Sequence, residues 1–468
     1  MVSDTKQRNT NVKDMTEGKP IRLMIGFSIP LLVSNVLQLF LVIADTAIIG
    51  RILGVNAFAS IGATGSLHWL VFSTVLGITQ GLGTLIAQRF GAKNTESLHK
   101  AFVTSVYIAA AFSVVTGVAG VIVNRPLLEL MRTPEALIDG SVTYLSWLWS
   151  GMPLFFGYNL LAMTLFSLGD SKTPLYAMIV ATVVNIAFNL ILVFPFEIAG
   201  IAVASLIAQA AAMVFCICAL RKTGVFRGCG YKFDKASAWP LLRLALPLGF
   251  RNAVIEIGGL VVQRYVNLYG TEFVAGVAAA KRMYSLLVIT GGAIEVSVAT
   301  FIAQNFGAKQ FDRIKQGIRA GLKLSVASMV IIMPVALLFG YQILVLLIDG
   351  DPRQISEVLG VGVRQLNLMA WGLPFLYLLF LYRAALQGLG NTFIPMLSGF
   401  TELAFRILSV IVLTQFIGDL GVLLADPIAW PFATALLMAA YYVVFRKQVA
   451  SNKASNKSQI TENNNYQA

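Results

Sequence analysis

Long apolar runs constrain the fold of this sequence more than any other feature. A helix needs about 20 apolar residues to cross a bilayer, and windows of that size recur along the chain. They fall at residues 24–49, 57–86, 101–123, 141–165, 173–196, 199–220, 240–268, 273–302, 318–341, 357–386, 393–416 and 421–445. Only 12% of the residues are charged, about half of the fraction that soluble domains carry. The sequence therefore predicts an all-α polytopic membrane protein with twelve transmembrane helices.

The basic residues predict how the chain is oriented in the membrane. Most of the 35 lysines and arginines lie in the loops of the side that holds both chain ends. The opposite loops hold only Arg51, Arg125, Arg132, Arg353 and Arg364. Cytoplasmic loops carry the excess of Lys and Arg, so both termini are expected in the cytoplasm. The net charge of +13 thus follows membrane topology, and nucleic acid is not an expected partner.

The chain also repeats itself. IAQRFGAK at Ile86–Lys93 recurs as IAQNFGAK at Ile302–Lys309, and GDSKTP at Gly169–Pro174 corresponds to GNTFIP at Gly390–Pro395. Six windows precede a basic linker and six follow it, so both halves insert the same way up. We expect an N-terminal tail at 1–20, a first lobe at 21–222, a linker at 223–239, a second lobe at 240–446 and a disordered tail at 447–468. Such repeats are typical of transporters, whose substrate sites lie between the halves.

Asp45 is the only acid well inside a predicted span of the first half. A carboxylate there costs roughly 2.5–3.5 kcal/mol on insertion scales and by default marks a pathway or relay. Thr182, Asn185 and Asn189 share one face of the fifth window, and Ser205 lies on the sixth. They offer the hydrogen bonds that a buried carboxylate needs, although polar contacts between helices are an alternative role. Such an acid can bind a proton or, with these oxygens, sodium, and the sequence leaves both open.

The second half carries a different set of ionisable residues. Glu256 and Glu295 are its deep acids, while Glu402 and Arg406 are spaced i, i+4 and can pair on one helix face. The sequence has no zinc-protease H-E-x-x-H motif and no phosphate-binding loop. We therefore expect neither an enzyme nor a nucleotide-driven pump, and no cofactor or resident metal. Transport driven by an ion gradient needs none of these.

These motifs, taken together, resemble the multidrug and toxin extrusion (MATE) family, and its bacterial members in particular. The resemblance covers roughly residues 20–446 and is carried by PLLVSNVLQ at Pro30–Gln38, DTAIIGRILG at Asp45–Gly54 and the paired AQxFGAK loops. It implies two six-helix lobes around a V-shaped central cavity. It also implies export of small organic compounds, often cationic and amphipathic, in exchange for H+ or Na+.

The same resemblance implies roles for individual residues. Asp45 matches the acid of the family's ion site in the first helix, and Asn185 and Asn189 match a polar pair in helix five. Many members have an acid at the position of Asn189, and Ser205 falls where members often carry Thr. Glu256 resembles the helix-seven acid of the sodium-coupled branch, whose helix-ten Asp is missing here.

Pro30 matches a helix-one proline that the family is proposed to use in bending. Proline removes a backbone hydrogen bond and permits a kink. Our hypothesis is that protonation of Asp45 weakens its bonds to Asn185 and Asn189, so that helix one bends and releases the substrate.

Other functions are compatible with parts of this pattern. The same architecture suits a flippase for lipid-linked saccharides, which would need a markedly basic cavity. A channel is disfavoured because the chain has two repeats and no filter-like segment. We expect a monomeric multi-pass protein of the bacterial inner membrane, with small-molecule substrates and the lipid bilayer as its partners.

Overall fold

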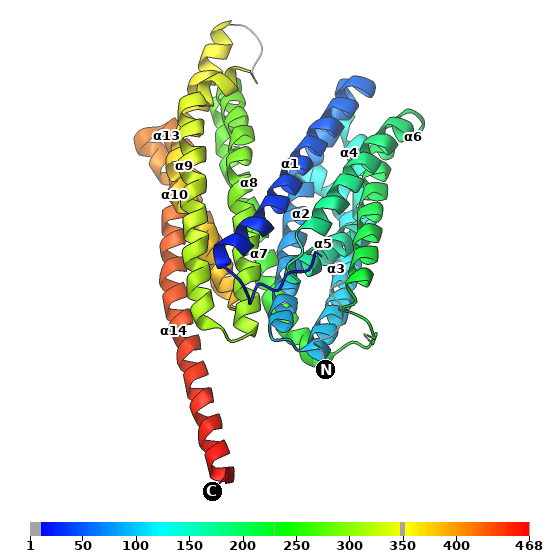
Figure 1. Ribbon diagram of the computed structural model, residues 1–468. Helices are drawn as coiled ribbons and strands as arrows, with labels where there is room; N and C mark the ends of the chain where they lie inside the picture. Colours follow the sequence, from blue (N-terminus) through cyan, green and yellow to red (C-terminus); the bar gives the residue numbers. More distant parts are fainter. Residues whose placement is uncertain (1–10, 229, 347–351, 468) are drawn as a thin grey trace. The chain divides into compact units, whose positions relative to one another are not determined.

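The computed structural model describes residues 11–228, 230–346 and 352–467, and every regular element in these ranges is helical (Figure 1). The first elements are α1 (Pro20–Ile52), α2 (Gly54–Gly91), α3 (Thr95–Leu130), α4 (Glu135–Ser150), α5 (Met152–Ser167), α6 (Lys172–Thr223) and α7 (Lys235–Val266). They are followed by η1 (Asn267–Tyr269), α8 (Thr271–Gly307), α9 (Phe311–Val345), α10 (Pro352–Gly388), α11 (Phe393–Leu408), η2 (Ser409–Leu413), α12 (Thr414–Ile417), α13 (Asp419–Leu423) and α14 (Ala425–Gln467).

All twelve predicted windows are helical, which confirms the all-α fold class. The fourth window is interrupted at Gly151, between α4 and α5. The fifth and sixth are the two arms of α6, which join at Glu197, where φ is 49° and ψ is −125°. Windows eleven and twelve correspond to α11–α12 and α13–α14. Within the described ranges, 10 helices are long and apolar enough to cross a membrane.

The end of the chain differs from the expectation for residues 447–468. Composition predicts a disordered tail, whereas α14 continues from its apolar part as far as Gln467. A helix that is already nucleated extends by one hydrogen bond for each added residue, so it can run on into polar sequence.

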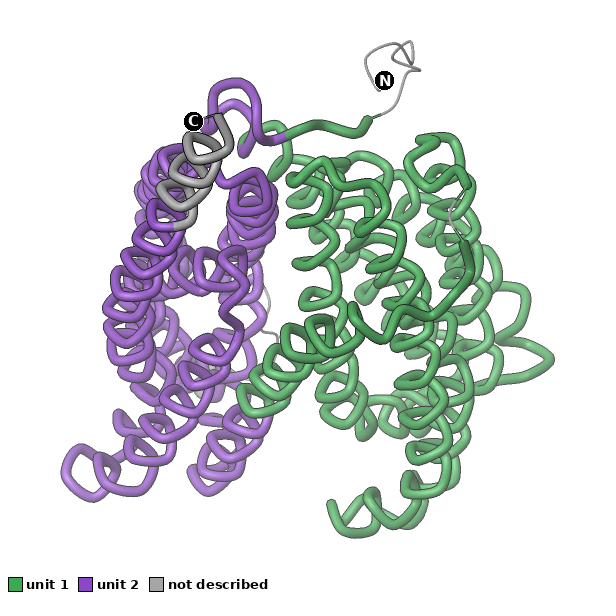
Figure 2. The backbone as a smooth tube through the Cα atoms, turned by 90° about the horizontal axis from the view of Figure 1, so that it is seen from below, with its two compact units in different colours: residues 1–14, 25–256 green, residues 15–24, 257–468 purple. Residues whose placement is uncertain are grey.

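Two compact units make up the chain (Figure 2). The first contains the segment up to Asp14 and Ile25–Glu256, and the second contains Met15–Met24 and the chain from Ile257 onward. The core of the first unit combines residues of α2 to α5 with Leu241, Leu244 and Ala245 of α7. The first part of α7 therefore packs in the first unit, although it lies within the predicted second lobe. The lobe limits 21–222 and 240–446 stay a prediction.

Two glycines let α2 and α7 approach each other backbone to backbone inside the first unit. A Cβ atom at Gly77 would lie 2.4 Å from the carbonyl oxygen of Leu248, and one at Gly81 would lie 2.4 Å from Cα of Ala245. The two positions form a G-x-x-x-G pattern, which is typical of close helix contacts in membranes. Only glycine fits this contact without moving one of the helices.

The internal repeat is visible in the way equivalent helices end. Lys93 after α2 and Lys309 after α8 both adopt positive φ, at 54° and 57°. Each of them donates its backbone N–H to a carbonyl three residues earlier, that of Phe90 or Phe306. The later turns agree as well, because Gly169 and Gly390 have φ values of 81° and 79°. The repeated sequence motifs thus encode repeated helix caps.

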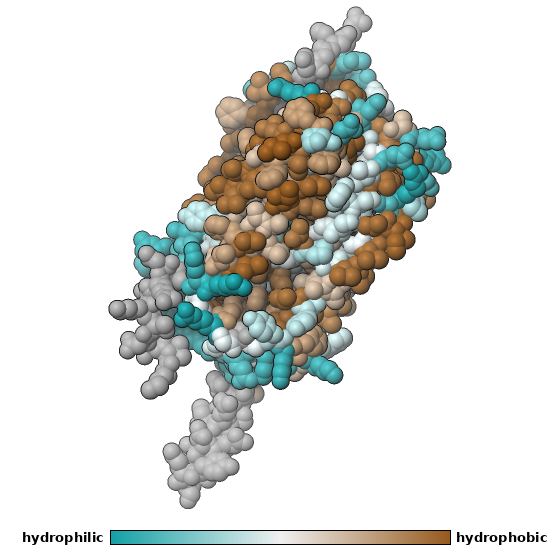
Figure 3. All heavy atoms as spheres, turned by 90° about the vertical axis from the view of Figure 1, so that its right-hand side faces the viewer, coloured by the Kyte–Doolittle hydropathy of each residue, from teal (hydrophilic) through white to brown (hydrophobic). Residues whose placement is uncertain are grey.

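Large apolar side chains stay exposed on the outer faces of several helices, for example Ile122 on α3, Phe194 on α6 and Ile331 on α9. Figure 3 shows one face, where hydrophobic side chains fill the middle and hydrophilic ones gather toward the ends. Exposed apolar surface of this extent is unfavourable in water, but it is what a lipid-facing helix presents.

Candidate functional site

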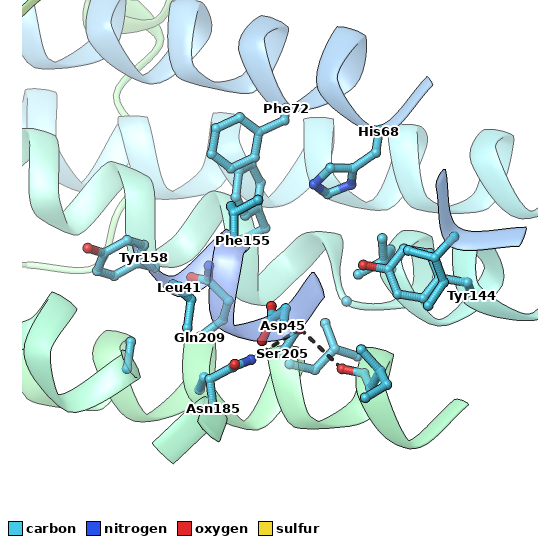
Figure 4. Close-up of a pocket in the computed structure, with 18 of the residues that line it drawn as sticks. Leu41, Asp45, His68, Phe72, Tyr144, Phe155, Tyr158, Asn185, Ser205 and Gln209 are labelled. Atoms are coloured by element: carbon cyan, nitrogen blue, oxygen red, sulfur yellow. Dashed lines mark hydrogen bonds between the residues drawn. The ribbon is translucent and has the colours of Figure 1, made fainter. Parts of the chain in front are cut away.

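A cavity of about 300 Å³ lies among α1, α2, α4, α5 and α6 of the first unit. Asp45 lines it from α1, and Asn185, Ser205 and Gln209 line it from the two arms of α6. Figure 4 shows these polar side chains together, with His68, Phe72 and Phe155 facing them across the cavity. Asp45 is the only carboxylate among the lining residues, and none of them is a lysine or an arginine.

A chain of hydrogen bonds connects Asp45 to both arms of α6. Asn189 Nδ2 donates to Asp45 Oδ1 at 2.6 Å and to Asn185 Oδ1 at 2.9 Å. Asn185 Nδ2 in turn donates to Ser205 Oγ at 3.3 Å, and Ser205 donates to the Ile201 carbonyl at 3.1 Å. The spacing i, i+4 brings the two asparagines onto one face of the first arm. Asn185, Asn189 and Ser205 of the predicted polar set thus lie together with Asp45, and their role as an ion site stays a prediction.

Two buried amide oxygens of this region lack a hydrogen-bond donor among the described residues. They are Asn189 Oδ1, which lies behind the cavity wall, and Gln209 Oε1, which lies on it. An unsatisfied buried acceptor is costly, and a proton donor or a cation would satisfy it. Among the described residues, no group of three or more His, Cys, Asp or Glu side chains could hold a metal ion. The chemistry available here is thus the reversible binding of a proton or of a cation held by few charges.

Two of the candidates from the first half lie apart from this chain of hydrogen bonds. The Thr182 hydroxyl donates to the Met178 carbonyl of its own helix at 2.8 Å, and Thr182 does not line the cavity. Pro30 lies inside the continuous helix α1, where its carbonyl accepts a bond from the Ser34 hydroxyl at 3.0 Å. A threonine hydroxyl often bonds its own helix in this way, so shared helix face alone does not identify a ligand.

In the second unit, the predicted pairing of Glu402 with Arg406 needs correction. Arg383 of α10 lies 2.5 Å from Glu402, and Arg406 forms an ion pair at 2.6 Å with Asp426 of α14. Each residue of the i, i+4 pair therefore has its nearest partner on another helix. The side chains of Arg383 and Glu402 are only 5% and 4% exposed, so neither charge has water as an alternative partner. Asp426 was not among the predicted residues.

The remaining acids of the prediction, Glu256 on α7 and Glu295 on α8, are both partly buried and do not line the Asp45 cavity. Their roles stay predictions. Sequence reasoning also missed residues that line the cavity, notably His68 on α2 and Tyr144 on α4. For His68, the sequence offered one signal, which is that a histidine within an apolar run is unusual. For Tyr144 it offered none, because only the packing of the helices brings its side chain to the same cavity as Asp45.

A family model named MatE matches residues 30–191 and 247–413, which is more than half of the chain. The chain belongs to the MatE family of multidrug and toxin extrusion transporters. As a MATE transporter it is a multi-pass membrane protein that moves small molecules. The family assignment agrees with the resemblance drawn from the helix-one and loop motifs.

Similar proteins support the assignment along almost the whole chain. A probable multidrug resistance protein of Bacillus subtilis, YoeA, is 32% identical over 448 residues, which cover 91% of this chain and 94% of that protein. A protein of Shewanella oneidensis named FAD transporter is 28% identical over 442 residues, with coverage of 91% and 94%. A crystal structure described as MATE in the bent conformation has a TM-score of 0.85 at 17% identity, covering 95% of this chain and 99% of that one. At that identity the last likeness concerns the fold alone.

Proposed function

We propose that this MATE transporter exports organic cations in exchange for protons that bind at Asp45. The observation that carries the proposal is the single carboxylate in a cavity whose other walls are largely apolar and aromatic. Phe72, Phe155, Tyr144 and Tyr158 all line it, and aromatic faces attract organic cations. An amphipathic cation and a proton would then compete for the same acid.

The bond from Asn189 to Asp45 supports the proton as the coupling ion. Asn189 turns its N–H group toward the carboxylate, at 2.6 Å, and a hydrogen bond of this kind favours the charged acid. Protonation weakens the bond, which gives the site two states that differ in their contacts. Hard cations are bound by several oxygen atoms, whereas here the Asn189 oxygen is not turned toward Asp45. Sodium is the alternative coupling ion and would require that amide to rotate.

The proposed cycle uses helix α1 as its moving part. Asp45 and Pro30 lie on the same helix, and the missing backbone bond at proline lowers the cost of bending. Loss of the Asn189 bond on protonation frees the part of α1 that carries Asp45. The helix then bends near Pro30, and the cation leaves the cavity.

Transport measured in proteoliposomes tests the proposal. Vesicles that contain the purified protein and a fluorescent organic cation such as ethidium are given either a pH gradient or a sodium gradient. We expect exchange with the pH gradient alone, loss of that exchange in Asp45→Asn, and normal exchange in Glu135→Gln. Glu135 is an exposed acid in the first turn of α4 that does not line the cavity. Wild-type exchange in Asp45→Asn would overturn the proposal, and exchange with the sodium gradient alone would replace the proton.

A flavin nucleotide is a second candidate substrate. The relative from Shewanella oneidensis is named a FAD transporter, and the second unit of this chain carries a partly buried lysine, Lys281, which suits an anion. Its Nζ donates to the neutral amide oxygen Gln263 Oε1 at 3.1 Å, whereas Arg383 and Arg406 of the same unit are paired with carboxylates. Uptake of FAD into the same vesicles, with no movement of the organic cation, would favour this candidate.

We also propose that the protein lies in the bacterial inner membrane with both termini in the cytoplasm. The uneven distribution of lysine and arginine supports this orientation. A reporter that is active only outside the cytoplasm, fused after Ala468, should be silent. The same reporter inserted between α3 and α4 should be active.

A further inference from the structure

A second large cavity of the first unit lies where α3 begins and where α5 and α6 end. Its volume is about 650 Å³, and its floor is apolar, with Val103, Leu161, Ile217 and Leu220 among its lining residues. It shares no residue with the Asp45 cavity. Val106 on its edge is 43% exposed, so the cavity opens outward beside α3.

Two arginines stand at the polar end of this cavity. Arg221 lies in the last turn of α6 and Arg227 in the loop that follows, and both side chains are exposed. Neither guanidinium group has a hydrogen-bond or ion-pair partner among the residues that the structure describes. None of the lining residues is an acid. The cavity therefore combines an apolar floor with two positive charges that no described residue neutralises.

The loop that carries Arg227 is attached to α3 at several points. The Tyr107 hydroxyl donates to the Tyr231 carbonyl at 2.9 Å, and the backbone N–H of Asp234 donates to the Thr104 hydroxyl at 3.1 Å. Phe226 packs on Phe102 with ring centroids 4.3 Å apart. Aromatic residues concentrate where membrane and water meet. The aromatic residues and the basic loop at the polar end of the cavity are of the kind found at a membrane interface.

We propose that this cavity binds an anionic phospholipid. Its phosphate would lie between Arg221 and Arg227, whose planar guanidinium groups suit phosphate geometry, and the upper part of an acyl chain would lie on the floor. Basic pockets between transmembrane helices on the cytoplasmic side are suited to such headgroups, and the proposed orientation puts this end in the cytoplasm. Free inorganic phosphate shares the charge but has nothing to cover the apolar floor.

Binding of labelled lipid to the purified full-length protein in detergent tests the proposal. Phosphatidylglycerol should bind at least about tenfold more tightly than phosphatidylcholine, and the double variant Arg221→Gln/Arg227→Gln should lose most of that preference. The matched control Lys222→Gln/Lys235→Gln removes the same charge from residues that do not line the cavity and should bind like wild type. Val106→Trp fills the edge of the cavity, keeps both arginines and should also weaken binding.

Several results would overturn the proposal. Equal binding of the two lipids would show that the cavity does not select a headgroup with a net negative charge. An equal loss in the lysine control would show that only general surface charge matters. Displacement of the lipid by inorganic phosphate at similar concentration would assign the arginines to a free anion. The readout is binding, so it does not depend on whether Asp45 couples transport.

Discussion

Replacing Gly81 with alanine should destabilise the first unit, because α2 meets the backbone of α7 at this position. The added Cβ atom would lie 2.4 Å from Cα of Ala245 and 2.5 Å from the Leu244 oxygen. Carbon atoms in contact normally lie about 3.5–4.0 Å apart, so the helices must separate by roughly 1 Å. Overpacking lowers the free energy of unfolding by about 1–3 kcal/mol, and we expect the upper value here because the atoms in the way belong to the backbone and cannot rotate aside. The higher helix propensity of alanine compensates up to about 1 kcal/mol. The net loss of stability is therefore about 2 kcal/mol.

Thermal unfolding of the purified protein in detergent measures this loss, and Gly65 supplies the matched control. Gly65 lies on the same helix, and a Cβ atom there would meet nothing within 4 Å. Gly81→Ala should lower the melting temperature by about 4–8 °C if the unit behaves as a domain of 150–250 residues. Gly65→Ala should leave it unchanged or raise it slightly, because only the propensity gain remains. An unchanged melting temperature in Gly81→Ala, or an equal drop in both variants, would refute the assignment of a backbone contact.

Four further predictions concern individual side chains. Arg383→Leu should lower the free energy of unfolding by about 3–5 kcal/mol, because it leaves the buried Glu402 carboxylate without its ion-pair partner. The double variant Arg383→Leu/Glu402→Leu should lower it far less. Denaturation in detergent compares the two variants. Glu197→Gly should stabilise the protein by about 1 kcal/mol, since it relieves a positive φ of 49°, and the same melting assay detects the increase. Asn189→Leu should reduce the rate of proton-driven export by about tenfold or more. It removes the hydrogen bond to the Asp45 carboxylate, and the loss of one bond to a charged group corresponds to a factor of about this size. Thr182→Val should leave initial export rates nearly unchanged, because that hydroxyl bonds only its own helix.

The sequence predicted the transmembrane helices well, because length and hydrophobicity almost determine a span in a bilayer. Spacing along a helix predicted that Asn185 and Asn189 share a face. Their association with Asp45 and Ser205 was expected because a buried carboxylate needs hydrogen-bond partners and because of the family resemblance. The boundary between the windows 173–196 and 199–220 also agrees with the turn between the two arms of α6 at Glu197.

The ion-pair partners in the second unit were beyond the sequence pattern. The spacing of Glu402 and Arg406 suggested a pair within one helix, yet Arg383 and Asp426 are their nearest partners. A charge in a low-dielectric environment pairs with whichever opposite charge has the best geometry, and helix packing decides which one that is. The same limit hid Tyr144, which reaches the Asp45 cavity from α4.

The two units treat their buried charges differently, and this difference bears on coupling. In the second unit, Glu402 is paired with Arg383 at 2.5 Å and Asp426 with Arg406 at 2.6 Å, so each of these buried bases is neutralised by a carboxylate. In the first unit, Asp45 has a neutral amide as its partner at 2.6 Å, and its protonation strands no charge. Of these three acids, Asp45 is the one paired with a neutral group, which supports the proposal that it binds the coupling ion. In the proposed exchange, the coupling ion binds in the first unit, while the ion pairs of the second unit stabilise the packing of its helices.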